Sequence, residues 1–581
     1  MYQKEYFVPK HTGTYAETLE AYGLAHLLTK IFEANSTKGP RVTIADSGTH
    51  YVVSAREPIT EEMVRNTDYV EMFRYIKVEK DNSPDVPVSH IDYAAQKKKR
   101  KVFDQFITDR RKELNEKKLT KAEYKRRIDD YEDKPHPDLD VLSRLAFASC
   151  YNHVYMMARQ GDFHTLLAAV LSKYSSQFAG DHTTAIIGND SENENRKKRA
   201  KWLAIKVTAL QLISPSQSKG TNSSRLFLNE HNPKIPWISQ YLRFAGCYSG
   251  MIPRGVAKES KDTKVYVIEP TSFEYNRLKG VYDSFKPTLR GTHTLKLDII
   301  CLLKYCAELI RNSEEYKSKT FLRKWKPENS VAGFHLAYLK NMGNNPGVTN
   351  ISFLALPVFI EINSFDDAES WLSILDEHLN IIESINDKDN SVTTMLLHYR
   401  QFLSGSMVSE FFKFNLAYNA WMIQQRERKN MYVKPFSLKL LKELFMATID
   451  KKLAPILESP GFQSLADAIR NTTIKAQIAK GNGVKGRQYG LDIRYGLTQE
   501  IKRKCLRKSD FESFIWEFVA DYGRQLGRNA EGGHQKFSAI RTNEIEDFVK
   551  MLDDNEDQIE VIAKMLVAYG YALEEKKSNK Q

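Results

Sequence analysis

The segment from Arg470 to Lys508 has the composition of a surface that binds phosphates. It holds eleven Lys or Arg residues against two acids, Asp492 and Glu500. Cations neutralise phosphates and release counterions, and the hydroxyl and amide side chains of the same segment supply further hydrogen bonds. Its centre, Gly481 to Gly486, has the glycines and asparagine of a loop between two helices. We therefore predict a nucleic-acid interface here, with a solvated charged face as the alternative interpretation.

A second basic segment runs from Lys97 to Arg127, with fourteen Lys or Arg residues against five acids. Its pattern predicts two short helices that break near Leu119, with Thr120 and Glu123 as a capping box. Its first five residues also resemble a nuclear localisation run, which nothing else in the sequence supports. The residues predicted to contact a nucleic-acid backbone come from both segments: Lys97, Lys98, Lys99, Arg100, Lys475, Lys480, Lys485, Arg487, Arg494, Lys502, Arg503, Lys504, Arg507 and Lys508.

Two polar loops carry side chains that suit base edges. Ser214 to Arg225 lacks bulky apolar residues, so no core can hold it, and it does not follow the GxxxxGK[ST] order of a phosphate-binding loop. Amide and cationic side chains read donor and acceptor patterns in a groove. The predicted DNA-reading residues are Gln217, Lys219, Asn222, Arg225, Asn344 and Asn345. An ordinary surface loop, or asparagines that only supply turn geometry, is the alternative in each case.

Composition limits the class of protein. The 581 residues carry a formal net charge of +13 with a pI near 9.1, which favours a polyanionic partner. The five cysteines form no CxxC pair and no zinc spacing, as expected in a reducing cytoplasm. The N-terminus does not predict a signal peptide, and the most apolar run, Ile351 to Ile362, is too short to span a membrane. We find no catalytic motif, and predict no enzyme, no metal site and no cofactor.

The predicted fold class is α+β with several domains. A helix over 14–34 and a hairpin of strands over 41–45 and 51–55 begin a mixed α/β region with small antiparallel sheets. Strands are expected over 202–213, 264–269 and 351–362, the last one buried, and helices over 140–169, 237–246 and 295–312. After Ser364 the pattern is helical, with single apolar stripes that predict an antiparallel bundle and a capping box at Ser509 to Glu512. The expected ranges are 1–363 with the basic helical insertion 97–127, a connector over 364–430, and a bundle over 431–581.

Several runs of this sequence resemble one family. SPGFQSLADAIRNTTIKAQ (459–477), IRYGLTQEIKRK (493–504) and IAKMLVAYGYA (562–572) are similar to the large subunit of type I CRISPR effector complexes, the Cascade surveillance complexes. LEAYGLAHLL with VTIADSG and YVV (19–53), LQLISPSQSKGTNSSR (210–225) and KVYVIEP (264–270) resemble the N-terminal part of that family. These stretches are spread over most of the chain and are not catalytic signatures. The basic insertion over 97–127 has no counterpart in the resemblance.

The resemblance implies a function. Such a subunit recognises the protospacer-adjacent motif (PAM) in double-stranded DNA, helps open the duplex, and binds guide RNA and DNA strands. Its C-terminal bundle lines the displaced strand and helps recruit the helicase-nuclease. The implied partners are the guide CRISPR RNA, target double-stranded DNA, the backbone, 5′-handle-binding and small subunits of Cascade, and a helicase-nuclease or transposition adaptor, in the cytoplasm and without a membrane. The alternative is a general RNA/DNA-binding or transposition-linked adaptor that does not read a PAM.

Overall fold

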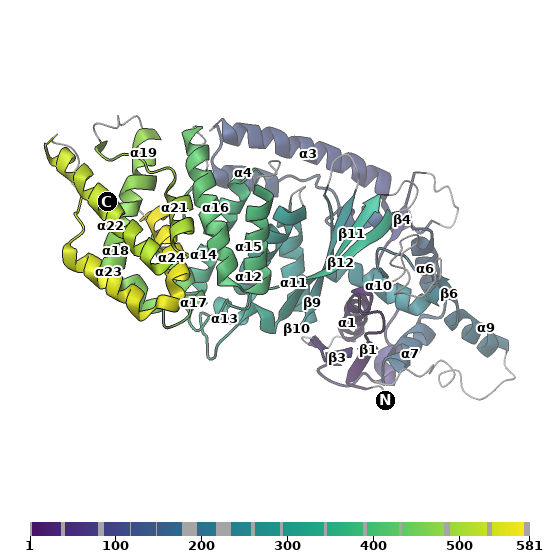
Figure 1. Cartoon of the computed structure of the whole chain (residues 1–581). Coiled ribbons are helices and arrows are strands. Elements are labelled where there is room, and N and C mark those ends of the chain that lie inside the picture. The colour runs from purple at the N-terminus through teal and green to yellow at the C-terminus, as the bar shows by residue number, and fades with distance from the viewer. Residues whose placement is uncertain are drawn as a thin grey trace. The chain divides into compact units, whose positions relative to one another are not determined.

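The computed structural model describes residues 3–35, 41–79, 86–116, 118–146, 148–176, 194–215, 234–256, 262–290, 294–341, 346–386, 392–428, 433–481, 489–531 and 537–574 (Figure 1). Its contacts divide the chain into two units. The first comprises Met1–Thr292 and Glu328–Leu354, and the second comprises His293–Pro327 and Ala355–Gln581. The class is α+β, as predicted. The units do not follow the predicted ranges, because helix α12 (Thr294–Asn312) packs against α14 (Phe365–Ser384) and α15 (Thr393–Gly405) of the second unit.

The first unit contains two four-stranded sheets. One has the order β1-β3-β2-β10 and is antiparallel throughout; in the other, β12-β11-β9-β8, strand β9 pairs antiparallel with β8 and β11. The predicted hairpin is confirmed, with Asp46 opposite Tyr51 and Gly48 at φ +89° in the turn. The strands are β1 (Glu5–Pro9), β2 (Val42–Asp46), β3 (His50–Ala55), β8 (Met251–Gly255), β9 (Thr263–Pro270), β10 (Ser272–Glu274), β11 (Val331–Asn341) and β12 (Pro346–Ala355), with the parallel pair β4 (Tyr75–Lys77) and β5 (His90–Asp92) and the antiparallel pair β6 (Lys206–Thr208) and β7 (Lys234–Pro236).

Helix α1 (Ala16–Ala34) is the centre of the first unit and is buried on nearly every side, although its sequence predicts a single apolar face. It packs against β2 and β3 and crosses α10 (Trp237–Gly250). The crossing is close because each helix brings a glycine, Gly23 and Gly246, to the other helix's backbone. The other helices among the described residues of this unit are α2 (Glu61–Arg65), α3 (Tyr93–Asn115), α4 (Lys121–Asp129), α5 (Leu139–Leu145), α6 (Ser149–Gln160), α7 (Phe163–Lys173), α9 (Glu194–Leu203) and α11 (Tyr275–Phe285), followed by the 3-10 turn η2 (Lys286–Thr288).

Gly246→Ala should therefore destabilise the first unit strongly. A Cβ atom at this position would lie 2.0 Å from the carbonyl oxygen of Leu19, so the two helix backbones must separate. We expect a loss of about 1–3 kcal/mol or more in the free energy of unfolding, as for overpacking of a core. Gly280→Ala in α11 is the matched control, because its Cβ meets no atom within 4 Å. Helix propensity should make that change stabilising by up to about 1 kcal/mol. Equal melting curves for the two variants would contradict the close crossing.

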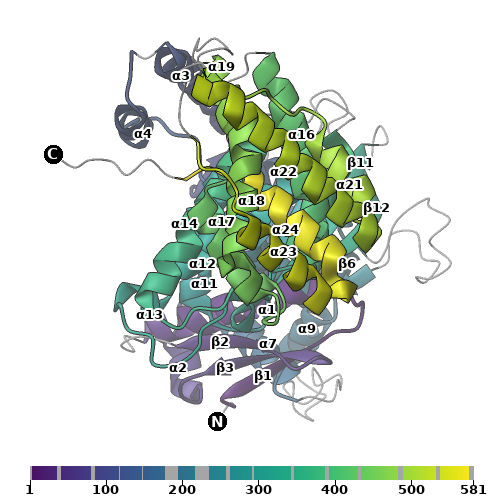
Figure 2. The same cartoon turned by 60° about the vertical axis from the view of Figure 1, so that its left-hand side comes forward.

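The second unit is helical in the part that follows Ser364 and includes a bundle of antiparallel helices (Figure 2). The predicted apolar stripes are confirmed: Phe511, Phe514 and Phe518 are buried, and so are Phe548 and Leu566 on two later helices. Its described elements include α12, α13 (Glu314–Lys317), α14, α15, α16 (Val408–Glu427), α17 (Leu438–Thr448), η5 (Ala454–Glu458), α18 (Pro460–Arg470), the π-helical turn η6 (Asn471–Lys475), α19 (Ala476–Gly481), α21 (Leu497–Lys504), α22 (Lys508–Glu531), α23 (Thr542–Asp554), η7 (Glu556–Gln558) and α24 (Ile559–Tyr571).

Three local predictions are wrong in part. The strand expected over 351–362 ends at Ala355 and is not buried throughout: Phe353 is 45% exposed, because β12 lies at the edge of its sheet. The strand expected over 202–213 shrinks to β6, because Trp202 belongs to the preceding helix. Helix α22 begins at Lys508, which places Ser509 inside the first turn rather than at the N-cap.

Candidate nucleic-acid interface

Helix α21 presents a group of cations because its apolar residues recur every four positions. Leu497, Ile501 and Cys505 are buried, as predicted, and face α22 and α24. The intervening side chains must then point away from this core. Lys502, Arg503 and Arg507 are exposed and Lys504 is half-buried. We call these four cations the α21 cation group.

No ion-pair partner lies near the α21 cation group within the described part of the chain. The neighbouring cations of the segment differ. Lys508 pairs with Asp553 at 2.5 Å, and the Arg494 guanidinium lies 3.6 Å from Asp521 and 5.1 Å from the centre of the Phe518 ring. A phosphate would find the α21 cation group without first displacing a carboxylate. Arg494 and Lys508 have structural roles already, and Lys475 is half-buried.

The position of α21 depends on the π-helical turn η6. Such a turn leaves carbonyl groups without their usual helical partners. In η6 the Thr472 carbonyl accepts a hydrogen bond from the Arg494 backbone N–H at 2.8 Å, and the Asn471 carbonyl accepts one from the Tyr489 hydroxyl at 3.0 Å. The segment 489–494, which leads into α21, is therefore attached to the turn at both ends.

Helix α22 holds the other side of segment 489–494. Gly490 has φ +86° and lies against the buried Asn529 side chain, where a Cβ atom would be 2.1 Å from Oδ1. The Asp492 backbone N–H donates to Gln525 Oε1 at 3.1 Å. These contacts place the start of α21 relative to the bundle core. Lys485 and Arg487, predicted to contact the backbone, lie just before this segment and outside the described residues.

The first part of the basic segment does not face solvent, contrary to the prediction. Arg470 is 1% exposed, and Thr472, Thr473 and Gln477 are buried. The Arg470 guanidinium donates to the carbonyls of Tyr569 and Ala572 at the end of α24. Helix α18, η6 and α19 continue one another through the core, so hydroxyl groups counted as phosphate ligands bond to helix carbonyls instead.

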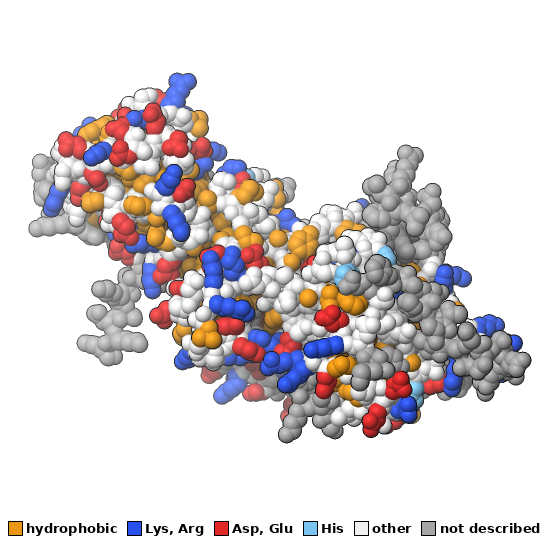
Figure 3. All heavy atoms as spheres, turned by 90° about the horizontal axis from the view of Figure 1, so that it is seen from below, with side chains coloured by type: hydrophobic (Ala, Val, Ile, Leu, Met, Phe, Trp, Pro, Cys, Tyr) orange, Lys and Arg blue, Asp and Glu red, His pale blue; other side chains and the backbone are white. Residues whose placement is uncertain are grey.

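Acidic side chains of α23 approach the end of the basic segment, where Asp553 pairs with Lys508. The excess of acids after Ser509 appears on α23 and the turn that follows it, where Glu546, Asp554 and Glu556 are exposed. In Figure 3 red acidic side chains are interspersed with blue ones over the part of the second unit that holds α23. Acids at this position repel phosphates.

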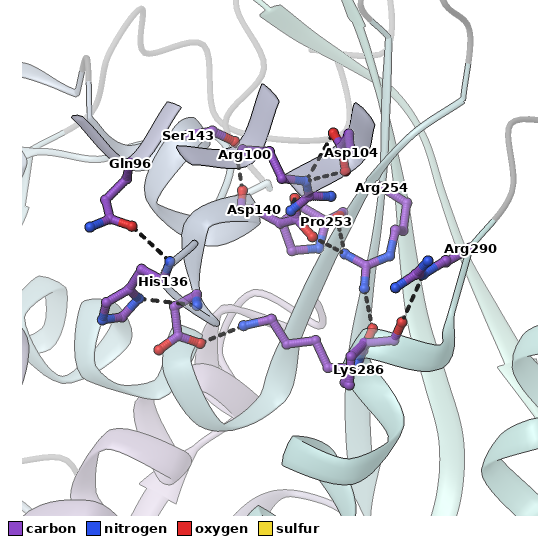
Figure 4. A network of polar contacts seen from close by, with 12 residues as sticks. Gln96, Arg100, Asp104, His136, Asp140, Ser143, Pro253, Arg254, Lys286 and Arg290 are labelled. Carbon is purple, nitrogen blue, oxygen red and sulfur yellow. Dashed lines mark hydrogen bonds and ion pairs between the residues drawn. The ribbon is translucent and has the colours of Figure 1, made fainter. Parts of the chain in front are cut away.

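The second basic segment forms helices α3 and α4, with the predicted capping box of Thr120 and Glu123. A polar network fastens α3 to the body of the first unit (Figure 4). Arg100 pairs with Asp104 and, at 3.7 Å, with Asp140, which also accepts from the buried Arg254. Gln96 accepts a hydrogen bond from the His136 backbone N–H. Helix α3 is thus held at a defined position.

The cations of α3, like those of the C-terminal segment, include some that pair with a carboxylate and some that do not. Lys97 and Lys98 are exposed and have no ion-pair partner among the described residues. Lys99 pairs with Asp133 at 2.5 Å, and Arg100 belongs to the network of Figure 4. Lys97 and Lys98 are therefore the predicted contacts of this segment that a phosphate can reach directly.

The predicted DNA-reading residues Gln217, Lys219, Asn222, Arg225, Asn344 and Asn345 lie outside the described residues. The described residues that flank 216–233 are firmly held. Arg243, buried between α1 and this segment, donates to Ser214 Oγ at 2.7 Å and to Glu20 at 2.8 Å. Burial opposes ionisation of Glu20, yet Arg243 and Lys173 hold its pKa at about 2. On the other side β7 pairs with β6.

One polar cluster escaped the sequence interpretation because its members lie far apart in the chain. Glu269, on β9, accepts hydrogen bonds from Tyr51 at 2.6 Å, Thr18 at 3.1 Å and Lys10 at 3.1 Å, and contacts His335 Nε2 at 3.1 Å. Burial opposes ionisation, but hydrogen bonds from His335 and Tyr51 hold the pKa of the Glu269 carboxyl below its usual range. The cluster joins α1 to both sheets.

The described residues contain no group of three or more His, Cys, Asp or Glu side chains arranged to hold a metal ion. Within the same ranges, every helix is too short or too polar to cross a membrane. No protein-family model matches the chain, and the search of curated proteins found no match.

Proposed function

We propose that the chain is the large subunit of a type I CRISPR RNA-guided surveillance complex. In this role it recognises the PAM in double-stranded DNA, helps open the duplex, binds guide RNA and DNA strands, and helps recruit the helicase-nuclease. The subunit assignment rests on the sequence resemblance. The observation that supports nucleic-acid binding is the α21 cation group, which is accessible and lacks carboxylate partners among the described residues.

The two kinds of predicted residue have different tasks in this proposal. The α21 cation group, with Lys97 and Lys98, contacts phosphates and so fixes position and affinity without reading sequence. Base reading is assigned to Gln217, Lys219 and Asn222, and pairing between guide and target supplies the remaining specificity. The proposed role requires no catalytic residue and no cofactor. The proposed partners are the guide RNA, target DNA, the other Cascade subunits and a helicase-nuclease or transposition adaptor in the cytoplasm.

Changing Gln217, Lys219 and Asn222 together to Ala should abolish discrimination between good and bad PAMs. The guide-loaded complex is titrated with duplexes that differ only in the PAM. A direct base contact contributes about 1–3 kcal/mol, so the ratio of the two affinities should fall by roughly tenfold or more. Guide loading, and binding to a single-stranded target, should not change.

Arg65→Ala with Asn66→Ala is a suitable control, since both residues are exposed on or next to α2. This variant should keep the discrimination. Persistent discrimination in the loop variant would place the reader elsewhere, with Asn344 and Asn345 as the next residues to test. If the wild-type complex binds all duplexes alike, the adaptor without PAM reading is the better assignment.

A further inference from the structure

Among the described cations of the predicted C-terminal interface, only Lys480 contacts both a carboxylate and a phenol hydroxyl. Its ammonium lies 3.2 and 3.0 Å from the two carboxylate oxygens of Glu427, at the end of α16. The Tyr495 hydroxyl donates to the same carboxylate at 2.7 Å and lies 3.2 Å from the ammonium. Glu427 is 53 positions from Lys480 in the sequence, so no local pattern indicated the contact.

The donors around Glu427 are those that a phosphodiester would use. An ammonium and a hydroxyl converge on one carboxylate, and the pKa of the Glu427 carboxyl is lowered: burial opposes ionisation, but hydrogen bonds from Tyr495, Lys480 and Gln477 outweigh it. Phosphate oxygens accept the same hydrogen bonds from lysine, tyrosine and amide groups. Tyr495 is 48% exposed, so solvent reaches this residue of the site.

We propose that Lys480 and Tyr495 form a phosphate subsite for single-stranded nucleic acid, and that Glu427 occupies it in the free protein. A phosphate of the bound strand displaces the Glu427 carboxylate, and a base stacks on the exposed Tyr495 ring. This inference rests on the nucleic-acid binding proposed above. It adds that Glu427 competes with the nucleic acid for Lys480 and Tyr495.

The competition is energetically feasible because the ion pair is weak. The Lys480 and Glu427 side chains are 56% and 32% exposed. Pairs this exposed are typically worth about 0.2–1 kcal/mol, which corresponds to a factor of up to about five in an equilibrium constant. A phosphate that also releases a counterion can exceed this energy. Glu427 therefore lowers the affinity of the subsite without closing it.

Glu427→Gln tests the inference in the full chain. The probe is a single-stranded oligothymidylate, measured by fluorescence anisotropy over a series of salt concentrations. Removing the competing carboxylate should raise the affinity about two- to fivefold. The salt dependence should change little, because the strand places a phosphate on Lys480 in both proteins. Glu560→Gln is the control, because it removes the same charge. Glu560 pairs with Lys564, but the Lys564 side chain is only 13% exposed and therefore less available to a phosphate.

A double-mutant cycle separates the subsite from the general loss of one negative charge. The gain from Glu427→Gln should disappear when Lys480 is also changed to Ala, whereas any gain from Glu560→Gln should survive that change. Binding by the wild type with no gain from Glu427→Gln, or a gain that is independent of Lys480, would overturn the inference and leave the proposed function standing. Absence of binding by the wild type and by Glu427→Gln alike would overturn both.

Discussion

Replacing Lys502, Arg503 and Lys504 together by Ala is expected to weaken duplex DNA binding on the order of a hundredfold at 0.1 M salt. These side chains have no described ion-pair partner, so their charge is available to phosphates. Each lost phosphate contact should reduce the slope of log K against log salt by about 0.9 units. The loss should be equal for matched and unmatched targets, because phosphate contacts carry no sequence information.

The control for this variant removes the same charge from another part of the second unit. Lys439, Lys451 and Lys452 are exposed on or after α17, a helix that packs against α14. Their replacement by Ala should change the salt slope much less. The three α21 cations also lie in the last turn of their helix, where loss of favourable interactions with the helix dipole can cost about 0.3–1 kcal/mol each. Melting curves of both variants therefore accompany the titrations. A folded α21 variant with unchanged affinity and slope would refute the assignment.

Arg470→Met is expected to lower the free energy of unfolding of the second unit by about 3–5 kcal/mol. Methionine replaces the volume of the arginine stem but donates no hydrogen bond. The carbonyls of Tyr569 and Ala572 lose the partner that now caps the C-terminal end of α24. Buried carbonyls without donors and the loss of a cation at a helix C-terminus both destabilise the fold. Chemical denaturation, followed by circular dichroism, measures the effect.

Asp467→Asn provides the comparison on the same helix. Asp467 pairs with Arg470 but is 58% exposed, so this change should cost less than about 1 kcal/mol. At temperatures where Arg470→Met remains folded, its DNA affinity should equal that of the wild type. The reverse result, weaker binding with unchanged stability, would return Arg470 to the interface that the sequence assigned to it.

Several elements were predictable because their signals are local. The apolar residues of α22 recur at helical spacing, and their burial at Phe511, Phe514 and Phe518 follows from that spacing alone. The turn at Gly48 and the capping box at Thr120 were equally readable, because each involves residues only a few positions apart. The group at Lys502 to Lys504 belongs here too, since Leu497, Ile501 and Cys505 define the opposite face.

Elements that depend on distant neighbours were not predictable in this way. The run from Ile351 has a composition typical of a buried strand, but its place at the edge of a sheet decides its exposure. Helix α1 looks amphipathic and is buried on nearly every side, because β2, β3 and α10 surround it.

The eleven cations between Arg470 and Lys508 show both sides of this division. The sequence alone determined that a concentrated positive charge exists there and that α21 has one apolar face. The sequence does not distinguish one of these cations from another, because composition is the same for a buried guanidinium and an exposed one. The tertiary structure separated them: Arg470 caps α24, Lys480 is held by Glu427, and the α21 cation group remains accessible. The physical reason is that the partner of each charge, whether a carbonyl, a carboxylate or water, is chosen by long-range packing, which local periodicity does not encode.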